Sequence, residues 1–215
     1  AFYGAPIEVD DHELWACRTA IQMQENLGLL REGWRNEGDR WPEIVHNMQN
    51  RIGISSGQMV TGNMGSESRM NYTMMGDNVN TAARLESSAK QYGIYIQIAD
   101  STYQPVKDKV IVRDLDNVRV LGKEEPVKVW ELISEIGQEP ELYKKLLPAY
   151  NEALKLYKNQ EWDNAIEAFK ASDALEDMFP GRKTNPSRIY IPRCEHFIDN
   201  PPGENWDGVW TLTSK

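Results

Sequence analysis

Residues 71–86 read NYTMMGDNVNTAARLE, and this stretch decides the fold of the chain. Residues 69–75 favour a β-strand, and the pair Gly76-Asp77 that comes next is typical of a turn. Over residues 78–91 the apolar spacing becomes that of a helix, with Asp77 as a suitable N-cap and Gly93 as the residue that ends it. The stretch therefore predicts a strand, a tight turn and a helix in succession.

Two polar side chains on the predicted helix are candidates for binding a ligand. Asn80 and Arg84 are four residues apart, so they lie on one face of the first helical turns. The N-terminus of a helix itself favours anions, and an amide beside a permanent cation suits a ribose or a phosphate. The alternative is a capped surface helix whose Asn80 and Arg84 are simply solvated.

The segments around this stretch alternate between strand and helix patterns. A helix is predicted over residues 10–31, capped by Asp10-Asp11, and a short helix over residues 100–106. Ser56-Gly57 indicates a hairpin between the strands of residues 51–55 and 58–63. Further strands are predicted over residues 94–98, 110–115, 118–121 and 127–132. The alternation indicates an α/β or α+β sandwich up to about residue 133.

The composition changes over residues 134–140, which we interpret as a linker between a unit of residues 1–133 and a helical unit of residues 141–215, the C-terminal extension. Residues 150–157 and 162–175 follow the small and aromatic spacing of one tetratricopeptide-like helix pair. A last helix is predicted over residues 187–199. Because one helix pair cannot bury both of its faces, the extension must dock on another surface.

Bulk properties exclude several classes of function. The 215 residues carry a net charge of −9, which disfavours a nucleic-acid surface because such surfaces gather Lys and Arg. No run of about 18 apolar residues is present, so we expect neither a membrane span nor membrane contact from this segment. Cys17 and Cys194 lack metal-ligand or disulfide spacing and are expected to be free thiols in a reducing, cytoplasmic compartment.

Several segments in the same order resemble the catalytic domain of class III nucleotide cyclases. They are RIGISSG at residues 51–57, VTGNMGS at 60–66 and YTMMGDNVNTAARLE at 72–86. AFYGAP at residues 1–6 resembles the segment directly after the family's second metal-binding aspartate, and VLGKEEPVKVWEL at 120–132 resembles its last hairpin. The resemblance covers residues 1–133 and implies a ferredoxin-like α+β sandwich that begins part-way through. The C-terminal extension resembles a helical segment behind some bacterial cyclase domains.

The resemblance implies a role for five residues. Thr73 matches the position that accepts from the adenine amino group, and Asn80 the one that positions the ribose. Arg84 matches the arginine that stabilises charge on the reacting phosphate. Arg51 matches an arginine that contacts the outgoing phosphates in some members. The family's triphosphate-binding lysine is replaced by Leu121, so Lys123 is either its substitute or an exposed hairpin lysine.

The resemblance also implies an activity, with alternatives. It implies an adenylate cyclase that converts ATP to cyclic AMP and pyrophosphate at a site shared by two subunits of a homodimer. Two Mg²⁺ or Mn²⁺ ions are implied, with ligands expected upstream of Ala1, so this chain alone is expected to be inactive. The alternatives are a regulatory module without catalysis and a guanylate cyclase. The protein is expected to be cytoplasmic, either by itself or as the cytosolic part of a membrane-anchored sensor.

Overall fold

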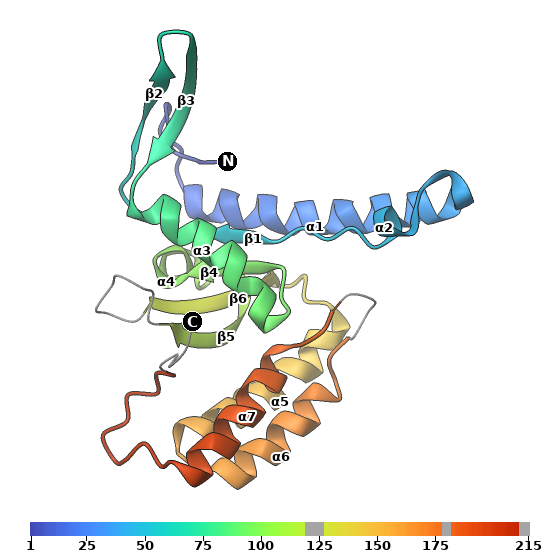
Figure 1. The fold of residues 1–215 in the computed structure, drawn as a ribbon, viewed down its shortest axis with the longest axis vertical. Coiled ribbons are helices and arrows are strands. Elements are labelled where there is room, and N and C mark those ends of the chain that lie inside the picture. Colours follow the sequence, from blue (N-terminus) through green and yellow to red (C-terminus); the bar gives the residue numbers. More distant parts are fainter. Residues whose placement is uncertain (119–126, 178–181, 211–215) are drawn as a thin grey trace.

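A computed structural model describes residues 1–118, 127–177 and 182–210 (Figure 1). A four-stranded sheet in the order β1-β4-β6-β5 lies at its centre; its strands are β1 (Ile52–Ile54), β4 (Ile96–Ala99), β5 (Val110–Val118) and β6 (Val127–Glu135). The β1–β4 pair is parallel and the other pairs are antiparallel. A second sheet is the antiparallel hairpin of β2 (Val60–Ser66) and β3 (Arg69–Met75).

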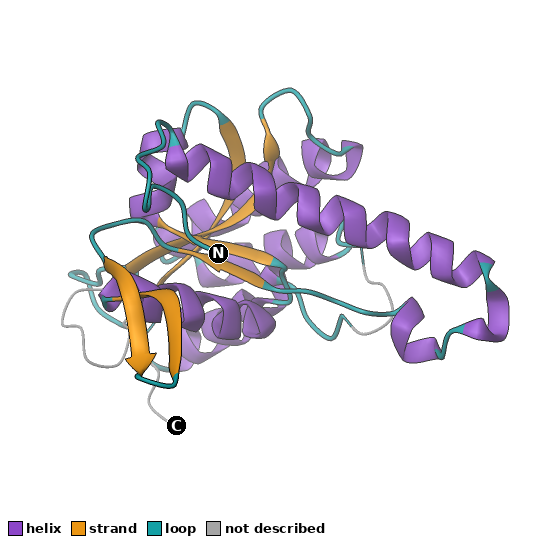
Figure 2. Cartoon of the chain, turned by 90° about the horizontal axis from the view of Figure 1, so that it is seen from above, coloured by secondary structure: helices purple, strands orange, loops and turns teal. Residues whose placement is uncertain are grey.

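Helices cover both faces of this mostly antiparallel sheet, so the predicted α+β sandwich is confirmed. The longer helices are α1 (His12–Asn36), α3 (Asp77–Tyr92), α5 (Glu141–Lys158), α6 (Trp162–Asp173) and α7 (Pro186–Asp199). Short helical turns are η1 (Gly38–Arg40), α2 (Glu43–His46), α4 (Asp100–Tyr103) and η2 (Gln104–Val106). Figure 2 shows the β2–β3 hairpin standing apart from the central sheet and α1 extending beyond it.

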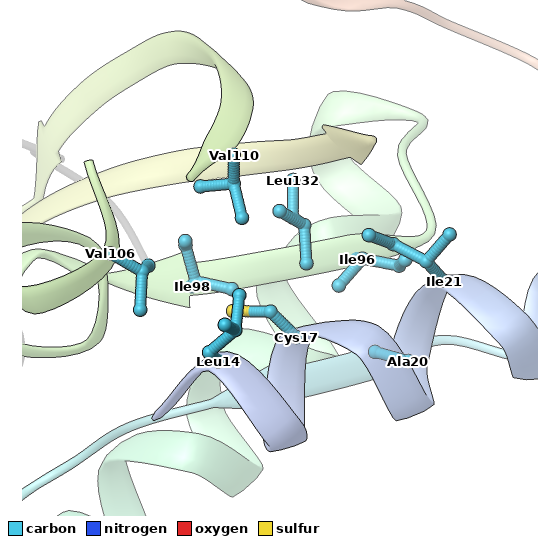
Figure 3. Close-up of a cluster of buried hydrophobic side chains, with 9 residues drawn as sticks. All are labelled: Leu14, Cys17, Ala20, Ile21, Ile96, Ile98, Val106, Val110 and Leu132. Atoms are coloured by element: carbon cyan, nitrogen blue, oxygen red, sulfur yellow. The ribbon is translucent and has the colours of Figure 1, made fainter. Parts of the chain in front are cut away.

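The N-terminal half of α1 buries its apolar stripe on one face of the sheet. Leu14, Cys17 and Ile21 recur at helical spacing and are all buried. They pack against Ile96 and Ile98, which point to the same face because they are two residues apart on β4 (Figure 3). The amphipathic helix predicted over residues 10–31 is therefore confirmed, and it continues to Asn36.

Both cysteines are free, as predicted, and the structure shows that both are buried. Burial, with the nearby carboxylates of Glu13 and Glu135, raises the pKa of the Cys17 thiol to about 12. Burial likewise raises the pKa of Cys194 to about 12. Because the thiolate is the reactive form, neither cysteine is suited to nucleophilic or redox chemistry.

Helix α3 covers the opposite face of the sheet. Its buried residues Leu85, Ala89 and Tyr92 pack with Leu115 and Val129 of the two antiparallel strands. The helix ends, as predicted, at a glycine in the left-handed conformation. This residue, Gly93, is favoured as glycine for two reasons: its φ angle is positive, and the backbone of Thr184 passes close to its Cα.

The C-terminal extension forms a three-helix unit with an aromatic core. Tyr150 and Tyr157 from α5 pack against Phe169 from α6 and Tyr190 from α7. Helix α5 begins nine residues before the predicted start because it continues through Pro148. A proline inside a helix removes one hydrogen bond, but burial of Leu146 and Tyr150 on either side of it outweighs that loss.

The extension docks on β5 and β6, beneath the sheet in Figure 1. Arg113 of β5 is fully buried and forms ion pairs with Glu131 of β6 and with Glu176, which follows α6. Burial would lower the pKa of Arg113, but the two carboxylates outweigh burial and raise it. A buried pair broken on one side costs about 3–5 kcal/mol, so this contact fixes the extension to the sheet. The prediction that the extension must dock is confirmed.

The predicted hairpin between residues 51–55 and 58–63 is wrong. The turn at Ser56-Gly57 is a bend that carries the chain out of the central sheet, where β1 pairs in parallel with β4 and β2 pairs with β3. A glycine turn signals a change of direction but does not determine which strand pairs next. Here β1 pairs with β4, whose residues are all buried, and β2 leaves for an exposed hairpin.

Other local predictions are corrected by tertiary contacts. Asp11 and Asp77 make no capping hydrogen bond; the Asp11 carboxylate instead accepts from Lys109 Nζ at 2.9 Å. The strand predicted over 110–115 continues to Val118 as β5, with bulges opposite β6. Of the strand predicted over 118–121, only Val118 is among the described residues. Residues 119–126, with the predicted turn and Lys123, lie outside the described residues. The proposed linker 134–140 overlaps the last two residues of β6.

The end of α3 gives a stability prediction with a matched control. Gly93 has φ +64°, and a Cβ there would lie 1.9 Å from the carbonyl oxygen of Thr184. Gly137 has φ +84° with nothing within 4 Å of an added Cβ. We expect Gly137→Ala to lower the free energy of unfolding by about 1–2 kcal/mol, from backbone strain alone. Gly93→Ala should cost clearly more in the same urea titration, and equal losses would contradict the close approach to Thr184.

Candidate active site

The candidate site is built where β3 passes into α3. Gly76 joins the two elements with φ +148°, a conformation that L side chains rarely adopt. Its carbonyl oxygen accepts from the backbone N–H groups of Val79 and Asn80 at 3.1 and 3.3 Å, which closes the first turn of α3. The predicted succession of strand, tight turn and helix is thus confirmed, with Gly76 as the N-cap position in place of Asp77.

Asn80 and Arg84 lie on the N-terminal half of α3, and both are exposed. Their four-residue spacing places them on one face of the helix, while Thr81 and Leu85 are buried on an adjacent face. An amide and a guanidinium therefore face solvent together beside a helix N-terminus. This arrangement can meet a phosphate with charge and directed donors.

Thr73 lies on β3, three residues before the turn, and is half-buried. Its partner across the hairpin is Gly62, where an added Cβ would meet nothing within 4 Å. Across the hairpin from Thr73, no side chain fills the space beside Gly62. Figure 1 shows β3 leading directly into α3, so the chain brings Thr73 to the same corner of the molecule as Asn80.

Arg51 lies next to β1 and is directed at α3. Its Nε is 3.2 Å from Glu86 Oε1. The side chain of Arg51 is 36% exposed and that of Glu86 is 40% exposed. Strand β1 and α3 pack closely here, since a Cβ on Gly53 would lie 2.1 Å from the carbonyl oxygen of Ala82. Arg51 is therefore an ion-pair partner of Glu86 in this structure, and its contact with a phosphate stays a prediction.

Asn78 is a site residue that the sequence pattern did not single out. Its Oδ1 accepts from Ser55 Oγ at 3.2 Å, and its Nδ2 donates to the carbonyl oxygen of Gln58 at 3.1 Å. A Cβ on Gly57 would lie 2.3 Å from Nδ2, so that glycine leaves room for the amide. Asn78 thus fastens the bend after β1 to the first turn of α3. The sequence pattern could not predict this contact, because Asn78 and the Ser-Ser-Gly bend are close in space but far apart in sequence.

Two further observations bear on the site. Within the described ranges, no three His, Cys, Asp or Glu side chains gather into a possible metal site. Among the described helices, none has both the length and the apolar composition needed to cross a membrane.

Comparisons with known proteins identify the family and several relatives of this chain. The family described as "Adenylate and Guanylate cyclase catalytic domain" matches residues 2–134. The terminal-differentiation-specific adenylate cyclase of Dictyostelium discoideum is 31% identical over 184 residues, covering 83% of this chain and 8% of that protein. This chain therefore spans a small part of that relative. The family match covers 133 of the 215 residues, which is less than the 83% of the chain that aligns with the Dictyostelium protein. The alignment with that protein must therefore also reach into the C-terminal extension.

Solved structures of cyclases share the fold. The crystal structure of the adenylyl cyclase CyaB from P. aeruginosa aligns with a TM-score of 0.54 and 29% identity, covering 64% of this chain and 68% of that one. The guanylyl cyclase Cya2 aligns with a TM-score of 0.50 and 28% identity, covering 63% and 65%. Together with the family match over more than half of its residues, these findings show that the chain belongs to the class III nucleotide cyclase family.

Proposed function

We propose that this chain is part of an adenylate cyclase that converts ATP to cyclic AMP and pyrophosphate. The observation that carries the proposal is the placement of Asn80 and Arg84, exposed on one face of α3 directly after the strand that bears Thr73. A relative whose sequence similarity reaches beyond the cyclase domain into the C-terminal extension is named as an adenylate cyclase. Thr73 also offers a hydroxyl that can accept a hydrogen bond from the adenine amino group.

In the proposed reaction the ribose 3′-hydroxyl attacks the α-phosphorus in line. The 3′-O–P bond forms, the bond to the β-phosphate breaks, and pyrophosphate and a proton are released. Negative charge builds on the non-bridging oxygens, where the guanidinium of Arg84 can meet it with directed donors. Asn80, one turn earlier on α3, would orient the ribose. Bound Mg²⁺ or Mn²⁺ would clamp the phosphates, with ligands expected upstream of Ala1.

We also propose that the working unit is a homodimer whose sites lie between subunits. The β2–β3 hairpin projects from the body (Figure 1) and exposes large apolar side chains: Val60 is 67% exposed, Met70 59% and Met75 60%. A two-stranded hairpin is marginally stable by itself in water, so this one is suited to pair with a partner. Since the hairpin leads into α3, such an interface would border Thr73 and Asn80.

The test is a cyclase assay of the full-length protein with Mn²⁺, offering ATP and GTP in parallel. Production of cyclic AMP from ATP would support the proposal. Preference for GTP would favour a guanylate cyclase, the second candidate, which the similarity to Cya2 keeps open. No cyclic nucleotide from either substrate would favour a regulatory module without catalysis.

Thr73 gives a prediction about base selection. Thr73→Val keeps the shape of the side chain but removes the hydroxyl, so the adenine amino group loses its acceptor. We expect the ratio of kcat/KM for ATP to that for GTP to fall about 10-fold, because an unpaired buried donor costs about 1–3 kcal/mol. Thr61→Val on the neighbouring strand is the control and should leave the ratio unchanged. An unchanged ratio in Thr73→Val would remove Thr73 from the base pocket.

A further inference from the structure

The C-terminal end of α3, opposite the candidate site, is enclosed by the C-terminal extension. Arg182, in the segment before α7, donates from Nε to the carbonyl oxygen of Gly93 at 2.9 Å. Its Nη1 donates to the carbonyl oxygen of Asp177 at 2.8 Å and lies 2.9 Å from Glu176 Oε2. Only 7% of the Arg182 side chain is exposed. One guanidinium therefore connects the end of α3 to the extension.

A second contact between α3 and the extension involves Tyr92, the last residue of α3. The hydroxyl of Tyr92 donates to Asp116 Oδ2 at 2.8 Å, and Arg193 Nη1 of α7 is 2.8 Å from the same oxygen. Ile189 of α7 packs against the cluster that holds Ala89. The last turn of α3 is thus held by groups of the extension, and carbonyl groups at a helix end favour cations such as Arg182.

The other end of the same helix carries the candidate site. Helix α3 has 16 residues and is about 24 Å long, so it transmits a displacement at one end to the other. The hairpin with Thr73 and the extension lie at opposite ends of the molecule, with α3 between them (Figure 1). Displacements of about 1 Å at a reacting centre can cost about 100-fold in rate.

From these contacts we infer that Arg182 is a positioning residue. Through Arg182 the C-terminal extension fixes α3 and thereby the placement of Asn80 and Arg84. The extension is on this account part of the catalytic unit. The inference rests on the proposed function for its effect on rate, but the mechanical link between Arg182 and α3 does not depend on it.

The experiment compares Arg182→Ala with two controls in the full-length protein. We expect Arg182→Ala to lower kcat about 10-fold with KM for ATP changed less than about twofold, because Arg84 acts on the transition state. Arg182→Lys should be intermediate, since one ammonium cannot reproduce the planar set of donors. The control Arg188→Ala removes an exposed ion pair with Asp173 inside the extension and should not change kcat. Ala165→Gly, in the buried core of α6, serves as the variant with lowered stability.

Amide hydrogen exchange provides a readout that is independent of activity. The amides of Gly93 and Ile94 are hydrogen-bonded to Lys90 and Ala89, and in Arg182→Ala we expect residues 89–94 to exchange about fivefold faster or more. Exchange there should remain unchanged in Ala165→Gly. A loss of kcat no greater than in Ala165→Gly would overturn the inference, and so would unchanged exchange over residues 89–94. If the wild-type protein has no cyclase activity, the proposed function fails, while exchange still decides whether Arg182 fixes α3.

Discussion

Arg84→Ala in the full-length protein is expected to lower kcat by about 10²–10³ while leaving KM for ATP within about threefold of wild type. The reason is that the guanidinium would meet negative charge that builds only in the transition state. Binding of the ground state therefore changes little. Steady-state kinetics with ATP and Mn²⁺ measures both parameters directly.

The structure supplies matched controls for this variant. Lys90→Ala removes another exposed cation from α3, on its last turn, and should retain wild-type kcat. A urea titration of both variants checks that each remains folded under the assay conditions. A loss of kcat below about threefold in Arg84→Ala would show that Arg84 is a surface arginine with no role in the reaction.

Mixing two inactive variants is expected to restore up to about a quarter of wild-type activity. One variant carries Asn80→Ala and Arg84→Ala. The other lacks the metal-binding aspartates that we expect upstream of Ala1. In a shared-site homodimer each site takes Asn80 and Arg84 from one subunit and the metal ligands from the other. Half of the dimers formed from equal amounts are mixed, and each of these has one intact site of two.

The physical basis of this expectation is the two-fold symmetry of a homodimer, which uses the same surface on both subunits. Subunit exchange must be shown separately, for instance by energy transfer between labelled subunits. The control is each inactive variant mixed with itself, which should remain inactive. Absence of recovery despite demonstrated exchange would place Asn80, Arg84 and the metal ligands in one chain and would contradict a site between subunits.

The sequence by itself determined the part of the site that depends on local geometry. Gly76 and Gly93 lie at the two ends of α3, where the positive φ angles favour glycine. The two glycines themselves can be read directly from the sequence, so both helix ends could be predicted. The four-residue spacing of Asn80 and Arg84 places them on one helix face wherever the helix packs. The same stretch carries the family resemblance, so fold and candidate site could be predicted together.

The tertiary structure alone decided which distant segments meet. Strand β1 pairs with β4 and not with its neighbour in sequence, because β4 offers a buried edge far along the chain. Arg51 is paired with Glu86, and Asn78 is bound to the bend after β1; neither contact leaves a local pattern. The bond between Arg182 and Gly93 also joins residues far apart in the chain. Local periodicity records backbone conformation and burial, whereas the choice of partners depends on the whole folded chain.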